Sequence, residues 1–362
     1  MRWGGATETV VLTTLVAWAV LAGGAGVVVA TLRRRRRSRG TDGTTESGAE
    51  PGTPRTWCAV VANPTKFTGG QDPRNWLPER CAAAGWDEPR WWHTTPEDPG
   101  SGQTRAAVAD GAAVVVAYGG DGTVRAVAHA LAGQGVPLGL VPAGTGNLLA
   151  RNLGIPLANP EDCLRIALGT HSRVVDIGRI ELDVSGEDAE PARHTFLVMA
   201  GLGFDAEVMA TVEPRLKQKV GWWAYVVAGT RNLRGPSTRV VIRLDDRPPI
   251  VRRVRSVIVG NCGELAGGVR LMPDALIDDG WLDVVIVAPR GVVGWAAVTA
   301  AVLTRSQRGH QPVEHFRCRK LRVHAERPLQ AQIDGDPGGE ARVLRAEVDP
   351  RALTVRCPAG HA

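Results

Sequence analysis

The order of hydrophobic and polar positions changes character near residue 172. Before that point, short apolar runs alternate with segments of helical periodicity. The runs that predict strands are residues 57–62, 112–117 and 138–141, and the segments that predict helices are residues 76–85, 103–110, 124–132 and 148–153. Strands that alternate with helices favour a mostly parallel sheet with helices on both faces. The sequence therefore predicts an α/β domain over residues 55–172.

After that point, apolar runs follow one another with turns between them. They are residues 174–177, 196–199, 240–244, 254–259, 282–288, 321–323 and 331–333, and residues 215–233 and 292–304 predict two helices among them. Consecutive short strands joined by turns are typical of antiparallel sheets. We therefore expect a β-rich antiparallel second domain over residues 173–362. The pattern is compatible with a return of its C-terminal end to the first domain.

The N-terminal part predicts a membrane anchor. No charged residue occurs over residues 9–30, which is long enough to cross a bilayer as one helix, and arginines fill positions 33–37. Because positive charge stays on the cytoplasmic side, we expect one transmembrane helix within residues 1–32. This makes the chain a single-pass protein of the cell membrane whose catalytic part is cytoplasmic. A cleaved signal peptide is the alternative. Residues 33–54 form a basic run and a flexible tether, and the arginines either contact anionic lipid head groups or only set topology.

Composition narrows the classes of function. The net charge of +6 depends largely on the arginine run, so nucleic-acid binding is not expected. The six cysteines are scattered without CxxC spacing, which argues against a zinc site or a disulfide framework. The sequence leaves the oligomeric state open, and a homodimer is compatible with it.

The most informative motif is the sequence GGDGT at residues 119–123, between a predicted strand and a predicted helix. Glycines let the backbone approach a ligand closely, and a helix N-terminus offers free N–H groups to phosphates. Asp121 is unusual there, because a carboxylate repels phosphates. It implies a cation between them or a proton to be accepted, unless it only caps the helix.

A second loop repeats this arrangement at residues 142–147, with the sequence PAGTGN after the next predicted strand. The carboxyl ends of parallel strands lie at one edge of a sheet, which is where open α/β sheets bind ligands. The two loops together predict a phosphate-binding pocket.

These motifs, in this order, resemble the diacylglycerol kinase catalytic family, which includes bacterial lipid kinases and sphingosine kinases. Further segments that resemble the family are Asn63-Pro64, Thr94-Thr95, residues 201–205 (GLGFD), residues 267–283 with MPDA and DDGWLD, and residues 334–336 (DGD). The resemblance extends from about residue 55 to the end of the chain.

The resemblance implies an ATP-dependent lipid kinase that transfers the γ-phosphate to a lipid hydroxyl, with diacylglycerol as the usual substrate and Mg²⁺ as cofactor. By similarity, the residues that contact ATP are Asn63, Thr95, Gly119, Gly120, Asp121, Gly122, Thr123 and Thr145. The implied metal ligands are the carboxylate of Asp279 and the carbonyls of Leu276 and Trp281. The implied base is Asp336, and Asp121 is its rival, as in sphingosine-kinase-like members.

The chain departs from the family at three positions. Asp336 stands where bacterial members usually carry Glu, Leu148 where they carry Asp, and Arg125 where they carry Asn. Two other functions stay open at this stage. One is a kinase of a soluble substrate, since NAD kinases share a GGDGT loop, and the other is a non-catalytic lipid-binding member.

Overall fold

The computed structural model describes residues 56–67, 72–185, 191–203, 237–265, 269–289 and 313–360. All of them belong to the compact unit Pro54–Ala362. The predicted membrane anchor, basic run and tether lie outside the described residues, as do the predicted helices at 215–233 and 292–304.

The first half contains four parallel strands, β1 (Cys58–Ala62), β2 (Arg90–His93), β3 (Val114–Gly119) and β4 (Leu138–Pro142). Their order is β4-β3-β1-β2, and every neighbouring pair is parallel. β1 and β3 are buried along their whole length, as expected for central strands covered on both faces. The predicted mostly parallel sheet is confirmed.

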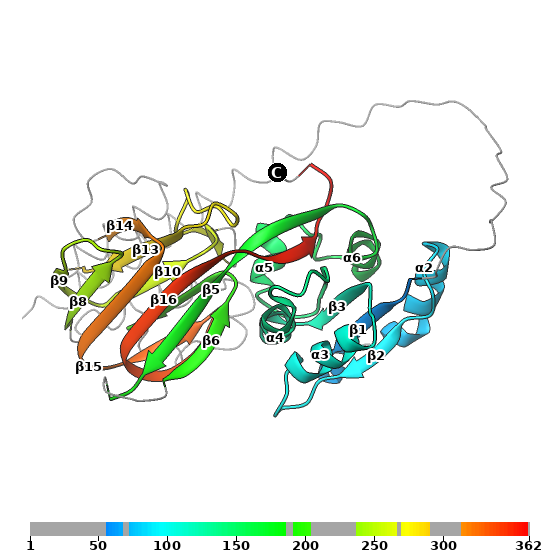
Figure 1. Ribbon diagram of the computed structural model, residues 1–362, viewed down its shortest axis with the longest axis horizontal. Coiled ribbons are helices and arrows are strands. Elements are labelled where there is room, and N and C mark those ends of the chain that lie inside the picture. Colours follow the sequence, from blue (N-terminus) through cyan, green and yellow to red (C-terminus); the bar gives the residue numbers. More distant parts are fainter. Residues whose placement is uncertain are drawn as a thin grey trace, which may run out of the picture. The chain divides into compact units, whose positions relative to one another are not determined.

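Five α-helices of this half are described. They are α2 (Leu77–Ala83), α3 (Ser101–Ala109), α4 (Asp121–Leu131), α5 (Leu148–Asn152) and α6 (Pro160–Ala167), with 3-10 turns η1 (Pro64–Lys66) and η2 (Pro73–Asn75). The Ser101 hydroxyl of α3 donates to the Ala126 carbonyl of α4, and Arg80 of α2 pairs with Glu161 of α6. These two helix pairs lie on opposite faces of the sheet (Figure 1).

The second half is built of antiparallel strands. They are β5 (Ser172–Asp183), β6 (Ala192–Phe196), β7 (Met199–Leu202), β8 (Thr238–Leu244), β9 (Ile250–Val254), β10 (Ser256–Gly260), β13 (Leu282–Val287), β14 (Val313–Cys318), β15 (Lys320–Ile333) and β16 (Asp336–Arg356), with a small ribbon of β11 (Glu264–Leu265) and β12 (Val269–Arg270). The predicted β-rich domain is confirmed.

Two long strands join the halves. β5 and β16 are paired from Val343↔Asp183 to Arg356↔Ser172 and run side by side from one half into the other (Figure 1). At its C-terminal end β16 also pairs with β4 in parallel, Val355 opposite Leu138. The end of the chain thus returns to the first half.

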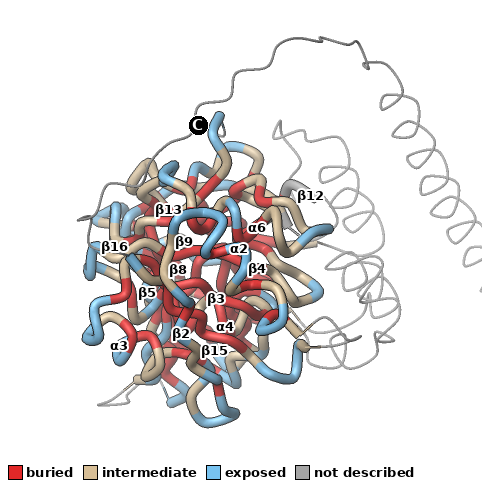
Figure 2. Tube along the Cα trace, turned by 90° about the vertical axis from the view of Figure 1, so that its right-hand side faces the viewer, coloured by how far each residue is buried: buried red, intermediate tan, exposed pale blue. Residues whose placement is uncertain are grey.

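One hydrophobic core includes residues of both halves and a second core fills the β-rich half, so buried positions run through the whole unit (Figure 2).

The prediction of a single-pass membrane protein is corrected. Among the helices of the described ranges, from residue 56 to residue 360 with their gaps, none combines the length and the apolar character that crossing a bilayer requires. The residues on which the prediction depended, 9–30, lie outside those ranges.

Candidate active site

The two glycine loops are in direct contact. A Cβ built on Gly144 would lie 2.6 Å from the Cα of Gly120, which no real Cβ tolerates. The Ala143 N–H donates to the Gly119 carbonyl at 2.8 Å. Asn147 closes the second loop with its side chain, accepting from the Gly144 N–H at 3.0 Å and donating to the Gly144 carbonyl at 2.9 Å. The backbones of the two loops therefore form one continuous surface at the edge of the sheet.

Asp121 joins the two loops. Its carboxylate accepts the backbone N–H of Asn147 at 2.9 Å and that of Leu148 at 2.6 Å. Burial raises the pKa of Asp121, while these two hydrogen bonds act in the opposite direction and the charge of Asp336 raises it further. Both oxygens hold the second loop, so in this structure Asp121 acts as a clamp rather than as a cap of its own helix.

The other residues predicted to contact ATP follow the carboxyl ends of the parallel strands. Asn63 comes directly after β1 and caps η1, and its backbone N–H donates to the Tyr118 carbonyl of β3. Thr95 follows β2, and its hydroxyl accepts the Asp98 N–H. Thr123 is buried in the first turn of α4, and Thr145 is exposed in the loop after β4. Strand order places all of these positions along one edge.

Asp336 approaches this edge from the other half of the molecule. A Cβ built on Gly122 would lie 3.5 Å from an Asp336 carboxylate oxygen, so the carboxylate sits beside the first turn of α4. It is the first residue of β16, directly after a turn in which Asp334 and Gly335 have φ of 50° and 87°. Asp-Gly suits such a turn because both positions require positive φ. The structure thus brings both candidate bases, Asp121 and Asp336, to one site.

Two residues near Asp336, Asp334 and Arg125, make contacts in the site that their sequence pattern does not indicate. Asp334 is fully buried and accepts the backbone N–H groups of three consecutive residues, 197–199. Burial raises its pKa to about 6, against the attraction of Arg125. Arg125 entered the sequence analysis only as a departure from the family. Its guanidinium donates to the Ile333 carbonyl at 2.8 Å and to Asp336 at 2.9 Å.

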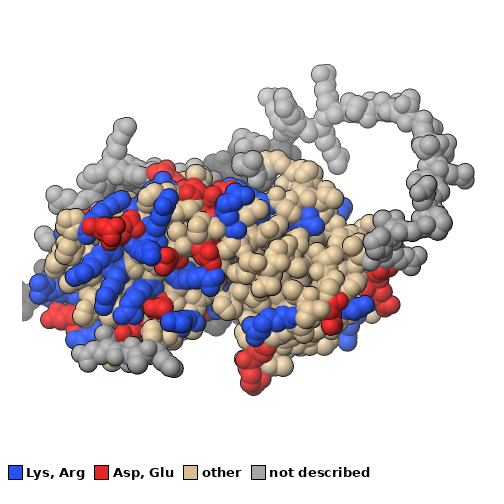
Figure 3. All heavy atoms as spheres, viewed as in Figure 1, with Lys and Arg blue, Asp and Glu red and all other residues tan. Residues whose placement is uncertain are grey.

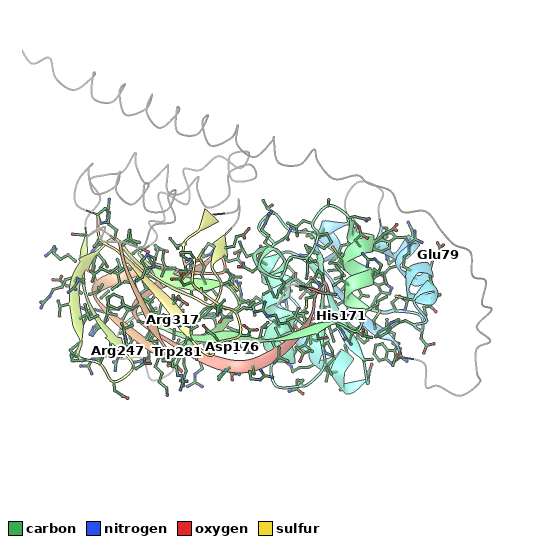
Figure 4. All side chains as sticks on the ribbon, turned by 90° about the horizontal axis from the view of Figure 1, so that it is seen from above. Glu79, His171, Asp176, Arg247, Trp281 and Arg317 are labelled. Atoms are coloured by element: carbon green, nitrogen blue, oxygen red, sulfur yellow. The ribbon has the colours of Figure 1, made fainter. Side chains whose placement is uncertain are left out.

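The predicted metal loop lies in the β-rich half, in the turn before β13. Asp279 accepts the Trp281 N–H at 3.0 Å with one oxygen and pairs with Arg317 through the other. Arg317 also lies over the Trp281 ring, 5.6 Å from its centroid (Figure 4). Leu276 is an exposed large apolar side chain. Asp176 of β5 fixes the loop by accepting the Gly280 N–H at 2.6 Å.

These residues do not fit a divalent cation in the arrangement that the structure shows. A metal would need the Asp279 oxygens, and a guanidinium cation already holds one of them. The other implied ligands, the Leu276 and Trp281 carbonyls, are neutral. Across the described ranges, no group of three or more His, Cys, Asp or Glu side chains is arranged to hold a metal ion. We therefore assign no step of the reaction to a metal at this loop.

A first prediction concerns this loop. Adding 5–10 mM Mg²⁺, or removing it with a chelator, should leave the melting temperature of the nucleotide-free protein nearly unchanged, because Arg317 neutralises Asp279. In Arg317→Ala the carboxylate is released, and Mg²⁺ should then raise the melting temperature by a few degrees through binding to the folded state. Arg105→Ala, an exposed arginine of α3, serves as the control. A Mg²⁺-dependent shift in the wild type that Asp279→Asn removes would contradict this prediction.

Comparison with known proteins agrees with the fold. The family model described as the diacylglycerol kinase catalytic domain matches residues 59–180, and the one described as the YegS C-terminal NAD kinase beta sandwich-like domain matches residues 198–357. A crystal structure titled as a diacylglycerol kinase from Bacillus anthracis str. Sterne superposes with a TM-score of 0.67 at 21% identity, covering 85% of this chain and 98% of that one. That similarity supports the diacylglycerol kinase fold alone.

Relatives with higher sequence identity show the family as well as the fold. The Probable lipid kinase YegS-like of Pseudomonas aeruginosa is 36% identical over 260 residues, covering 70% of this chain and 80% of the relative. The protein of the same name from Stenotrophomonas maltophilia is 31% identical over 265 residues, with 70% and 82% covered. The chain belongs to the YegS-like family of lipid kinases, and its residues 59–180 match the diacylglycerol kinase catalytic domain. Membership of this kinase family implies ATP as the phosphoryl donor.

Proposed function

We propose that the chain transfers the γ-phosphate of Mg-ATP to the hydroxyl group of a lipid, with diacylglycerol as the first candidate. The observation that carries this proposal is that two contacting glycine loops and a carboxylate from the other half, Asp336, meet at one edge of the parallel sheet. Phosphoryl transfer depends mainly on positioning and on neutralising charge, and this arrangement offers both.

The backbone of the glycine loops is the expected site of the triphosphate. α4 begins at Asp121, so the free N–H groups of its first turn and its positive dipole end face the edge at which both loops lie. Because Gly120 and Gly144 have no side chains, the backbones of the two loops can lie in contact and form one surface for the phosphates. Mg²⁺ bound to the nucleotide would offset part of the phosphate charge.

Asp336 is the expected proton acceptor. As the lipid hydroxyl oxygen forms its bond to the γ-phosphorus, the hydroxyl proton passes to the Asp336 carboxylate. The bond between the γ-phosphorus and the β–γ bridging oxygen breaks at the same time, and ADP leaves. Asp121 is less suited to this role, because both of its oxygens accept backbone N–H groups of the second loop.

The charge of the β-rich half supports a negatively charged lipid surface as partner. Lys and Arg gather on the face of this half that Figure 3 shows. Arg322 of β15 lies opposite Arg243 of β8 and opposite Arg345 of β16, and Arg239 lies opposite Arg253. Like charges at opposed positions destabilise a sheet. Within the described ranges, the structure shows no ion pair for Arg239, Arg243, Arg253 or Arg322. Anionic lipid head groups would provide the missing counter-charge.

The test is a transfer assay with γ-labelled ATP and Mg²⁺. Diacylglycerol, sphingosine, a total lipid extract and NAD are offered separately, and each lipid is presented in neutral vesicles and in vesicles that contain anionic lipid. We expect label in a lipid, several-fold faster on anionic vesicles at low salt than at high salt. Label in NAD would instead indicate the soluble-substrate kinase, and no label in any acceptor a non-catalytic member.

A further inference from the structure

Arg125 links the nucleotide-binding half to the turn that carries Asp336. It lies on α4, one helical turn after Asp121, and its side chain is 22% exposed. One terminal nitrogen donates to the Ile333 carbonyl at 2.8 Å and lies 3.9 Å from the buried Asp334. The other donates to Asp336 at 2.9 Å. Arg125 thus contacts the turn between β15 and β16 on both sides.

Asp336 depends on this contact for its orientation. Its side chain is 50% exposed, and in the described part of the chain its carboxylate has a hydrogen bond to Arg125 and to no other group. A half-exposed carboxylate without a partner samples several rotamers. Arg125, in contrast, is fixed by the rigid helix α4 and by the Ile333 carbonyl before it reaches Asp336. Arg125 can therefore hold the Asp336 carboxylate in one orientation.

Two of the three departures from the family, Arg125 and Asp336, occur at positions that touch each other. The motifs described above place Glu where this chain has Asp336, and Asn where it has Arg125. Asp is shorter than Glu by one methylene, about 1.5 Å, while Arg reaches much further than Asn. A longer cation at one position therefore compensates for a shorter acid at the other.

We propose that Arg125 is the positioning residue for Asp336, and that the Arg125–Asp336 pair replaces as a unit the Asn and Glu of the family. This inference rests on the proposed function, in which Asp336 accepts the proton of the lipid hydroxyl. Arg125 holds the carboxylate beside Gly122, at the glycine loop, so that the acceptor is in place before the lipid arrives. Its expected effect is therefore on the transfer step and not on ATP binding.

The experiment is a double-mutant cycle on the full chain with the best lipid acceptor from the transfer assay. Arg125→Asn and Asp336→Glu should each lower kcat by roughly 10- to 100-fold, while KM for ATP stays within about twofold. The double variant, in which acid and partner are exchanged together, should recover kcat to within about fivefold of the wild type. Arg125→Lys should be intermediate, since lysine keeps the charge but loses the planar fork.

Melting temperatures are measured for every variant, because Arg125 also faces the buried Asp334, and Arg105→Ala is the control for loss of a surface arginine. The inference is overturned if Arg125→Asn retains wild-type kcat, or if this variant changes KM for ATP alone. It is also overturned if the fall in kcat of the double variant equals the product of the two single-variant falls, because the two residues would then act independently. A wild type that labels no lipid overturns the proposed function instead, and the inference with it. These two failures are distinguishable because the second shows before any variant is made.

Discussion

Gly144→Ala should abolish ATP binding. A Cβ at this position would lie 2.6 Å from the Gly120 Cα and 2.9 Å from the Asn147 side-chain oxygen that holds the second loop. The Gly120 contact is backbone and cannot rotate away, so the two loops must separate. Losing the shared surface for the triphosphate should weaken Mg-ATP binding at least 100-fold, or about 2.7 kcal/mol, and reduce transfer to background. Titration calorimetry with Mg-ATP measures this directly.

Gly111→Ala is the matched control for this variant. Gly111 has a φ of +86°, so alanine is strained there, but its Cβ would meet no atom within 4 Å. It lies before β3, at the opposite end of that strand from the glycine loop. We expect a lower melting temperature with an unchanged dissociation constant for Mg-ATP. Gly144→Ala with wild-type affinity would mean that the loops do not form one nucleotide site.

The elements that could be predicted are those whose hydrophobic pattern and bounding turn residues lie within one short stretch of the sequence. Strands β1, β3 and β4 are continuous apolar runs bounded by turn residues, and their predicted bounds agree with the structure to within two residues. The sequence pattern does not predict β2, because its residues, RWWH, show neither alternation nor a long apolar run. In the structure this strand is only partly buried. α6 was missed although Asn159 caps it and Pro160 begins it, a signal that the sequence does contain.

The long strand β16 shows how local signals can mislead. Its first residues, DPGGE, are turn formers, which favour a turn at this point rather than the start of a long strand. In the structure they pair with β15 through an irregular register, and the strand runs for 21 residues from Asp336 to Arg356. Pairing with β5 over most of that length stabilises a conformation that the composition of the segment does not favour.

The candidate site was predictable as a set of positions but not as a set of contacts. The glycine loops could be placed side by side because parallel strands end at one edge. The contact between Arg125 and Asp336 joins residues 211 positions apart, and no periodicity encodes it. The same holds for Arg317, whose pairing with Asp279 across 38 residues changes the expected chemistry of the metal loop.

Asp121→Asn should abolish phosphoryl transfer through loss of the clamp between the loops. An asparagine side chain keeps one acceptor oxygen, and its NH₂ group would face a backbone N–H of Asn147 or Leu148, so one bond is lost and two donors oppose each other. Hydrogen bonds to a charged group contribute about 1.5–3 kcal/mol each. We expect the melting temperature to fall by roughly 4–8 °C, the affinity for Mg-ATP to fall at least tenfold, and transfer to become undetectable.

Asp176→Asn separates this role from a general loss of stability. Asp176 also accepts two backbone N–H groups, those of Gly280 and Arg351 at 2.6 Å each, and it too is buried and joins two segments. It should show a similar fall in melting temperature with unchanged affinity for Mg-ATP. If Asp121→Asn instead keeps wild-type melting temperature and Mg-ATP affinity while kcat alone collapses, then Asp121 is the base rather than the clamp, because only a group that acts in the transfer step changes kcat by itself.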